Sequence, residues 1–156
     1  MSAPRVTLVP VTEAEYDDFF AMLEVYDSEL EAYETVKPDH EVEFAVYRQS
    51  ILDDMEGREL LWIVEGDDRA GFAMTRTSAD WPDERSQIMS IAEFYIVPHR
   101  RRSGVGRAAV EQLLADHRRR GTFLVQASIM RENAAAREFW ERLGFELQFL
   151  QTSRRP

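Results

Sequence analysis

The stretch from Ile96 to Ala109 constrains this chain more than any other, because it joins a strand end to a helix start. An apolar run ends at Val97-Pro98, and proline cannot continue a strand ladder. Three arginines and a serine follow before Gly104-Val105-Gly106 opens a helical pattern. The first N–H groups of a helix have no partners within it, and the helix dipole adds positive potential there. Since glycine allows close approach and arginine donates to anions, the pattern predicts a phosphate-bearing cofactor on this turn.

The length and composition indicate a single folded domain over residues 1–156. A chain of 156 residues with 44% hydrophobic content can bury its own core. The sequence contains no internal repeat, no low-complexity linker and no composition shift that would mark a second domain.

Several classes of protein and site are excluded by what the sequence contains. With no cysteine, disulfides, thiolate nucleophiles and cysteine zinc sites are excluded. The three histidines, His40, His99 and His117, lack metal-ligand spacing and are predicted to be surface residues, so no metal is expected. No apolar run approaches the roughly 20 residues of a membrane helix. The first residues, Met-Ser-Ala-Pro-Arg, lack the apolar core of a signal peptide, and a cytoplasmic protein is expected.

The charge is divided unevenly along the chain. Residues 11–60 carry 16 acidic and 3 basic side chains, a local charge of −13, whereas residues 96–156 carry 6 acidic and 12 basic ones, a local charge of +6. An anionic cofactor on the basic side and a cationic substrate on the acidic side would fit this division. Solvated outer faces of acidic helices explain it equally well. Nucleic acid is not expected as a partner, because a chain with a net charge of −10 repels a polyanion.

Apolar periodicity and turn residues predict the order β-α-α-β-β-β-α-β-α-β. The antiparallel hairpins come first and a β-α-β crossover follows, which predicts an α/β fold with a twisted mixed sheet of about six strands and helices on both faces. The predicted strands are 6–9, 60–64, 70–77, 87–97, 122–129 and 145–150; the predicted helices are 12–30, 44–55, 105–120 and 134–143, and residues 78–85 are expected to be a loop.

The glycine turn also fits the dinucleotide-binding pattern G-x-G-x-x-A, which must be weighed against other phosphate folds. In that fold the turn usually follows its strand almost directly, whereas here residues 98–103 intervene. The next strand, which includes Val125 to Ser128, does not end in an acidic residue that could hold a ribose. Too few residues remain downstream for the further alternating strands. These features disfavour a dinucleotide fold.

Residues 101–106, Arg-Arg-Ser-Gly-Val-Gly, follow a strand and fit the pattern [QR]-x-x-G-x-[GA]. This pattern is the signature of the acetyl-CoA-dependent N-acetyltransferase superfamily known as GNAT, which the chain resembles. A second match is the N-x-x-A-x-x-F-[YW]-x-x-x-G-F pattern, and the order of elements also agrees. The matching residues of this second pattern are Asn133, Ala136, Phe139, Trp140, Gly144 and Phe145.

This resemblance implies where acetyl-CoA binds. The diphosphate of coenzyme A would lie on amides of the glycine turn, and the pantetheine arm would insert like a strand where two parallel strands separate. Asn133 would cap its helix and contact the cofactor arm, although capping alone also explains it. The cofactor contacts implied are Tyr95, Ile96, Val97, Arg101, Arg102, Ser103, Gly104, Val105, Gly106, Arg107 and Asn133.

The resemblance also implies direct transfer of the acetyl group to an amine. A primary amine is mostly protonated at pH 7 and must lose a proton, while a backbone N–H stabilises the oxyanion. Glu93 is the candidate base, because it is a charge in an apolar strand; pairing as a structural carboxylate is the alternative. Strand alternation puts Glu93, Tyr95 and Val97 on one face of the sheet and Phe94 and Ile96 on the other. The family often has a tyrosine to protonate the leaving thiolate, where this chain has Trp140, and indole is no useful acid. The substitutes are Tyr26, Tyr33, Tyr47 and Tyr95, or no acid at all.

In the family the first two helices and the loop before the motif strand wall the acceptor pocket. Residues 1–95 would therefore form the acceptor side and residues 96–156 the coenzyme A side. An acidic and aromatic wall suits a cationic small-molecule or peptide amine, such as a polyamine or an aminoglycoside. A non-catalytic acyl-CoA-binding or regulatory module on the same fold is the alternative, and a monomer and a homodimer both remain open. The expected wall residues are Tyr26, Glu29, Tyr33, Glu34 and Trp81.

Overall fold

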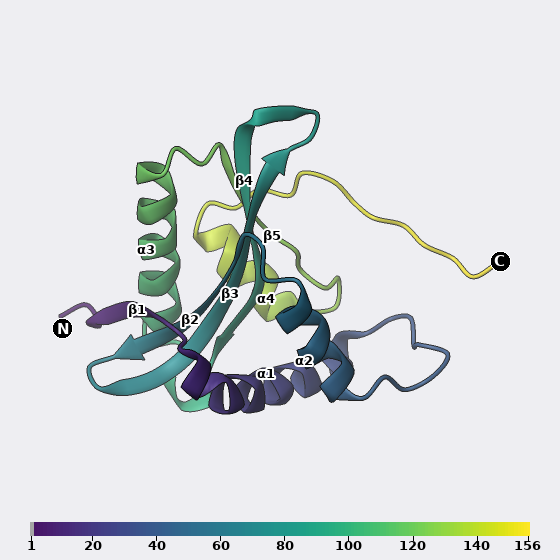
Figure 1. Ribbon diagram of the computed structural model, residues 1–156, viewed down its shortest axis with the longest axis horizontal. Coiled ribbons are helices and arrows are strands. Elements are labelled where there is room, and N and C mark those ends of the chain that lie inside the picture. The colour runs from purple at the N-terminus through teal and green to yellow at the C-terminus, as the bar shows by residue number, and fades with distance from the viewer. Residues whose placement is uncertain (1) are drawn as a thin grey trace.

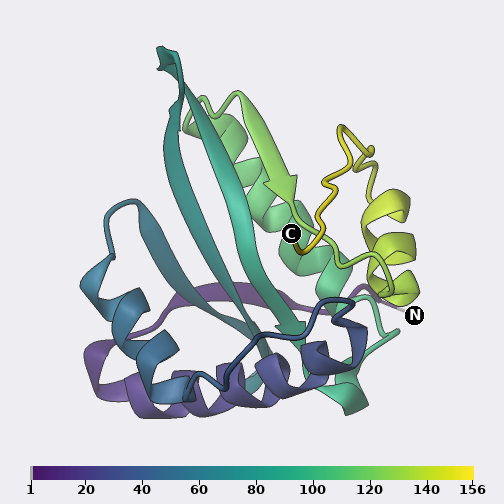
Figure 2. The same cartoon turned by 90° about the vertical axis from the view of Figure 1, so that its right-hand side faces the viewer.

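The molecule is built on a five-stranded sheet covered by helices on both faces, as Figures 1 and 2 show for the computed structural model, which describes residues 2–156. The strand order is β1-β2-β3-β4-β5; the first three junctions are antiparallel and β4 pairs with β5 in parallel. The strands are β1 (Val6–Pro10), β2 (Arg58–Glu65), β3 (Asp68–Asp80), β4 (Asp83–Ile96) and β5 (Leu124–Ala127). The helices are α1 (Tyr16–Leu30), α2 (Phe44–Asp53), α3 (Val105–Arg119) and α4 (Ala134–Arg142), with short 3-10 turns at Glu13–Glu15, Glu31–Tyr33 and Pro98–Arg100.

Each face of the sheet has its own hydrophobic core. Under α1 and α2 the core is aromatic, and the Phe19 ring meets Phe20, Trp62 and Phe72 edge-on at centroid distances of 5.4, 5.6 and 5.1 Å. Under α3 and α4 it is mainly aliphatic. This mixed sheet between two helical layers confirms the α/β fold class. Its main buried residues on the second face are Ile63, Met89, Ile91, Val105, Val110, Leu113 and Trp140.

The helices are short. Both α1 and α3 have 15 residues. Over residues 2–156, none of the helices combines the length and the apolar character needed to span a bilayer.

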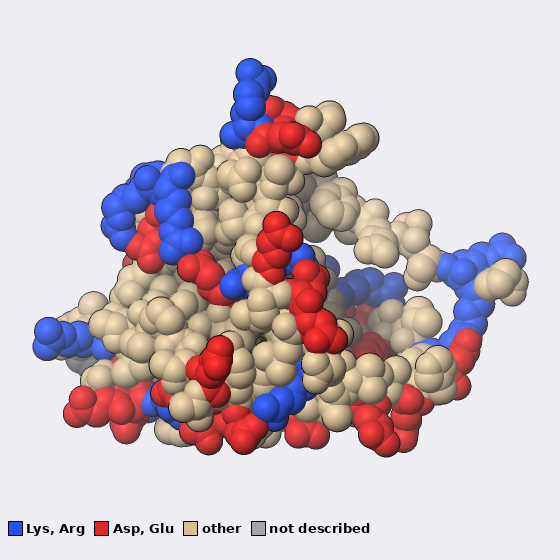
Figure 3. Space-filling model, viewed as in Figure 1, with Lys and Arg blue, Asp and Glu red and all other residues tan. Residues whose placement is uncertain are grey.

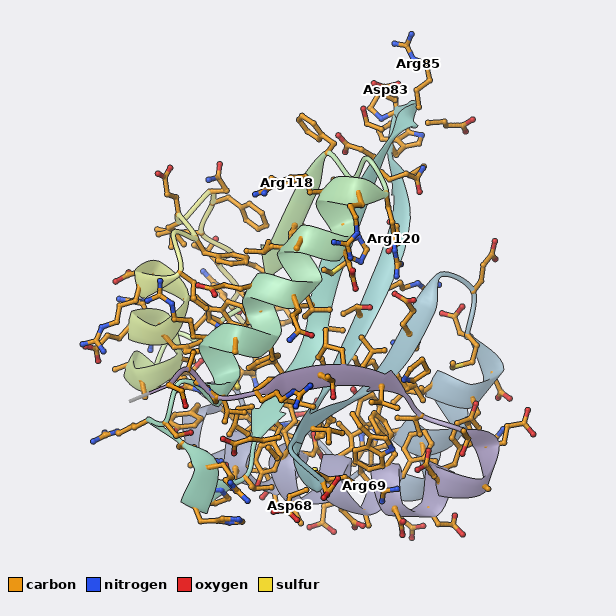
Figure 4. All side chains as sticks on the ribbon, turned by 90° about the vertical axis from the view of Figure 1, so that its left-hand side faces the viewer. Asp68, Arg69, Asp83, Arg85, Arg118 and Arg120 are labelled. Atoms are coloured by element: carbon orange, nitrogen blue, oxygen red, sulfur yellow. The ribbon has the colours of Figure 1, made fainter. Side chains whose placement is uncertain are left out.

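Arg69 links the β2–β3 turn to the start of α1 through two ion pairs. The guanidinium of Arg69, labelled in Figure 4, lies 2.6 Å from Glu15 and 2.9 Å from Asp18, and it stacks over the Trp62 ring at 4.2 Å. Exposed ion pairs contribute at most about 1 kcal/mol each. The stacking on an aromatic face adds a second contact that salt does not screen as strongly.

The expected loop at residues 78–85 is instead the end of a long β-hairpin. The β3–β4 ladder continues from Thr77↔Met89 through Ala79↔Gln87 to Asp80↔Asp83, and the hairpin projects beyond the rest of the sheet (Figure 1). The prediction was wrong because these residues are polar on both faces and show no apolar alternation. The ladder bonds are main-chain bonds, however, and do not require apolar side chains.

The predicted sixth strand at 145–150 is absent from residues 2–156, and the sheet has five strands. Phe145 still packs against Trp140, at 4.9 Å between ring centroids, but the chain then leaves the sheet as an arm (Figure 1). At its far end the Arg155 guanidinium pairs with Asp39 and donates to the Lys37 carbonyl. Alternating apolar residues indicate strand character, but they do not provide a strand to pair with. As a result Leu147, Phe149 and Leu150 are 76–78% exposed.

His117 lies in the core and not on the surface, contrary to the prediction from the sequence. It is 1% exposed on the inner side of α3, and its Nδ1 lies 2.8 Å from the Thr122 hydroxyl. Its Nε2 is buried without a partner in the described part of the chain. Three arginines, Arg118 to Arg120, follow it at the end of α3. Arg120, labelled in Figure 4, does reach outward to Glu59 at 3.1 Å, but the preceding turn faces the sheet.

We predict that His117 makes the fold acid-sensitive. Burial lowers the pKa of His117, and the Arg120 guanidinium lowers it further, against the opposing carboxylates of Glu59 and Asp116. The unfolded chain therefore takes up a proton first as the pH falls, and the stabilisation present above about pH 6.5 is lost below it. Denaturant unfolding of the protein and of His117→Gln between pH 5 and 8 should show a difference in unfolding free energy that shrinks toward low pH. A constant difference would contradict the prediction.

Candidate active site

The pairing of β4 with β5 stops near the middle of β4 and leaves an open main-chain edge. The two strands pair from Ile88↔Leu124 to Ile91↔Ala127, where β5 ends. β4 continues to Ile96, still paired with β3 on its other side. In the described residues no strand pairs with β4 on the β5 side beyond Ile91, and the Arg101 side chain bonds to the Ile96 carbonyl there. A polar, extended ligand can therefore bond to this edge as an additional strand would.

A β-bulge marks the point of separation. The register passes from Thr75↔Ile91 to Met74↔Glu93 and leaves Ala92 without a partner on β3. An extra residue reverses the side on which later side chains lie. Ile91 packs under α3 and α4, whereas Glu93 reaches a side chain of α2.

The alternation inferred from sequence for residues 93–97 agrees with the structure. Tyr95 and Val97 belong to the core under α1 and α2, and Phe94 and Ile96 to the opposite core. The N–H of Val97 donates to the Ala70 carbonyl at 2.9 Å, so its peptide groups face β3.

Because peptide groups alternate along a strand, Tyr95 also faces β3, and Ile96 and Phe94 face the open edge. Of the three backbone contacts expected for the cofactor, only Ile96 has peptide groups on that side. Phe94, whose peptide groups also face the open edge, was not among the expected contacts, because the direction in which a peptide group points depends on the register of β4 with β3.

The start of α3 presents free amides next to this edge. Gly104, the residue before the helix, has φ +88° and no side chain caps the helix in the described structure. Arg102 also lies in the left-handed region, with φ +60°. Between them the Ser103 hydroxyl donates to the Arg100 carbonyl at 2.5 Å and closes the turn. The uncapped amides and the dipole together favour an anion at this position.

The four arginines around the turn differ in what they can still bind. Arg100 pairs with Glu65 at 2.6 Å and with Asp68 at 2.7 Å. Arg101 pairs with Glu29 at 2.8 Å and donates from Nε to the Ile96 carbonyl at 2.8 Å. Arg102 is exposed, and Arg107 pairs only with an exposed glutamate one helical turn later. The last two are therefore the arginines available to an anionic ligand.

The second motif of the sequence packs against the first. The Asn133 side chain caps α4 by accepting from the Ala136 N–H at 3.1 Å. A Cβ on Gly106 would lie 3.2 Å from the Phe139 ring, so this glycine allows α4 to approach the start of α3. Trp140 is buried, with its ring 5.5 Å from that of Phe94. The position where the family often has tyrosine is thus a packing position here.

Glu93 is held by two tyrosines from two helices. The Tyr47 hydroxyl on α2 donates to Glu93 Oε1 at 2.8 Å, and the Tyr26 hydroxyl on α1 lies near enough to this carboxylate to lower its pKa. Burial raises the pKa of Glu93, and the two hydroxyls act against that rise. A half-buried carboxylate with a raised pKa is a chemically competent proton acceptor.

The tyrosines near the site are poor acids. Burial and the Glu93 charge raise the pKa values of Tyr26 and Tyr47 well above the ordinary range. Burial and the Glu29 charge raise the pKa of Tyr95, whose hydroxyl donates to Glu29 at 3.3 Å. Three of the four substitutes for the missing tyrosine therefore donate to carboxylates.

The structure brings together some of the expected acceptor-wall residues. The Tyr26 and Tyr95 rings are 5.6 Å apart, and Glu29 bonds to both Tyr95 and Arg101. Tyr33 and Glu34 lie beyond the end of α1, at the 3-10 turn and the residue after it. Trp81 is not near them: it is 84% exposed at the hairpin tip, roughly 30 Å along β4 from Glu93.

Acidic side chains gather along the lower edge of the molecule in Figure 3, which is the edge formed by α1 and the α1–α2 connection in Figure 1. Desolvation raises the pKa of Asp27, and the neighbouring carboxylates Glu31, Glu34 and Glu24 raise it further. Such mutual repulsion is relieved by a cation. Within residues 2–156 no group of three or more His, Asp or Glu side chains is placed to hold a metal ion.

Comparison with solved structures shows the same fold in several proteins. A transcriptional regulator from Bacillus halodurans C-125 has a TM-score of 0.72 at 20% identity, over 97% of this chain and 99% of that one. A ribosomal-protein-alanine N-acetyltransferase from Brucella melitensis biovar Abortus 2308 gives 0.72 at 14%, over 97% and 99%. An aminoglycoside acetyltransferase, meta-AAC0020, from an uncultured soil metagenomic sample, solved with sisomicin, gives 0.70 at 12%, over 97% and 96%.

These likenesses concern the fold alone, and no curated protein sequence matches the chain. The family assignment comes from the sequence itself, since the family model for acetyltransferases of the GNAT type matches residues 22–145. That range includes the bulged strand, the glycine turn and the capped helix α4. The chain therefore belongs to the GNAT acetyltransferase family.

Proposed function

We propose that this protein transfers the acetyl group of acetyl-CoA to an amine. The observation that carries the proposal is the position of Glu93, a half-buried carboxylate on β4 immediately after the bulge, where the open edge begins and leads to the uncapped start of α3. A candidate general base, an open main-chain edge and a turn suited to an anion thus follow one another within 15 residues.

The residues present fit coenzyme A. The amides at the start of α3, with Arg102 and Arg107, would hold the diphosphate, and the Phe94 and Ile96 peptide groups would hold the arm. Bound there, acetyl-CoA supplies an acetyl thioester. Asn133 acts on this site through α4, which it caps.

Glu93 would take the proton that the amine must lose. The amine nitrogen bonds to the acetyl carbon as the carbon–sulfur bond breaks, and the thiolate leaves with the electron pair. A model thiol has a pKa of about 8.5, so near neutral pH the thiolate needs only a modest proton source. Protonated Glu93 or water can supply this proton. The reaction therefore needs no acid from Trp140, which is a packing residue, or from the hydrogen-bonded tyrosines.

We further propose a cationic acceptor. Support comes from Asp27 on α1, whose charge acts on the Glu93 carboxyl and whose own charged neighbours are the carboxylates of Glu31, Glu34 and Glu24. The aminoglycoside enzyme with the same fold shows only that such a fold can serve a polycationic substrate.

A non-catalytic acyl-CoA-binding or regulatory module is the second candidate. Two observations favour it: Trp140 replaces the frequent tyrosine, and a transcriptional regulator shares the fold. Binding of acetyl-CoA without any transfer to amines would identify this module.

Substitution at the glycine turn tests cofactor binding. Gly104→Ala places a side chain at positive φ before α3, which costs about 1–2 kcal/mol of conformational energy and turns the amides away. We expect acetyl-CoA affinity, measured by calorimetry, to fall about tenfold or more. Gly121→Ala is the matched control, because Gly121 follows the other end of α3 at φ +76° with open space around it. Equal affinity loss in both variants would place the anion site elsewhere.

Substitution of the base tests the chemical step. Glu93→Gln keeps the size of the side chain and both tyrosine partners but cannot accept the amine proton. We expect kcat/KM to fall 10²- to 10⁴-fold, the usual contribution of a positioned base, with acetyl-CoA affinity unchanged. Turnover equal to that of the parent across pH would remove Glu93 from the mechanism.

A matched set of amines tests the acceptor class. Butane-1,4-diamine, butylamine and 4-aminobutanoate share a primary amine on a four-carbon chain and differ in the far charge. We expect kcat/KM to rank cation above neutral above anion, with a gap that narrows as salt rises. Because the chain has no cysteine, a thiol-reactive dye reports only released coenzyme A. A preference for 4-aminobutanoate would refute the cationic acceptor.

A further inference from the structure

The two tyrosines next to Glu93 come from two separate helices. Tyr26 lies in the middle of α1 and Tyr47 in the first half of α2. The Tyr26 ring packs against Phe72 and Tyr95 at 5.8 and 5.6 Å, and the Tyr47 ring against Phe44 at 5.9 Å. Packing fixes both rings, so their hydroxyls converge on Glu93 without further ordering.

A half-buried carboxylate that serves as a base, as Glu93 would, meets two opposing requirements. It must stay ionised to accept a proton, yet loss of water favours the neutral acid. Donors that bond to the charged form resolve this conflict, as each one stabilises the carboxylate and not the acid. Around Glu93 the donors are Tyr47 from α2 and Tyr26 from α1, while Asp27 on α1 opposes them and Arg58 on β2 assists.

We propose that Tyr26 and Tyr47 are positioning residues that form a clamp on Glu93. The clamp keeps the carboxylate ionised and holds it on the side of the sheet covered by α1 and α2. The clamp rests on the proposed function, since it explains how Glu93 serves as a base. It also explains why neither hydroxyl is the acid for the thiolate. Each is a hydrogen-bond donor to a negative charge and resists deprotonation.

The clamp can be tested by removing one hydroxyl at a time. In Tyr47→Phe the titration midpoint of the Glu93 carboxyl carbon, followed by ¹³C NMR and assigned with Glu93→Gln, should move upward by about one pH unit. The acidic limb of kcat/KM for butane-1,4-diamine should move with it, a loss of about tenfold on the limb. Tyr26→Phe should shift both readouts in the same direction. If Tyr47→Phe does not fold, the midpoint in Tyr26→Phe alone tests the clamp.

Tyr16→Phe is the control, because Tyr16 is also on α1 and packs edge-on against Phe20, but belongs to the first turn of the helix. It should leave the midpoint in place. Unmoved midpoints in both clamp variants would overturn the proposal, even if activity fell. A shifted midpoint in a protein that transfers no acetyl group would support the clamp and refute the proposed function. An unmoved midpoint with Glu93-dependent transfer would do the reverse.

Discussion

The loss of pairing between β4 and β5 after Ile91 is the constraint on which the rest of the site depends. A continuous sheet would satisfy the β4 peptide groups and leave nothing for a ligand to bond. β5 ends at Ala127, opposite Ile91, and the bulge at Ala92 turns Glu93 from the α3 side to the α1 and α2 side. The end of β5 thus leaves the open edge on β4, and the inserted residue places a carboxylate next to it. Neither effect would be useful for acetyl transfer without the other.

The two sequence motifs occur together because they pack on each other. Gly106 has no side chain, so the Phe139 ring can lie against the first turn of α3. Trp140 on the same helix fills the space beside Phe94, on the part of β4 that has lost its neighbour. Trp140 thus packs against the unpaired part of β4 from the α4 side, and the Asn133 cap sets the residue at which α4 begins. Helix α4 in this way helps to determine the geometry of the open edge of β4.

Local patterns predicted the element order, the two faces of β4 and the free amides before α3, because these follow from turn residues and alternation. They failed where long-range pairing decides. Residues 78–80 form a ladder without apolar alternation, and residues 145–150 have the alternation without a partner strand. His117 looked exposed beside three arginines, but a helix turns by 100° per residue and buries it.

The candidate site shows the same limit, since a charge summed over a segment does not reveal which charges the fold neutralises. Within residues 11–60, Glu29 pairs with Arg101 at 2.8 Å and Glu59 with Arg120 at 3.1 Å, and both arginines lie outside this segment. The local sum of −13 therefore overstates the field that a substrate would meet. Asp27 differs, because its neighbours are carboxylates and its pKa rises. Only such unrelieved repulsion can be converted into affinity for a cation, so the position of Asp27 beside the Glu93 clamp carries more weight than the net charge.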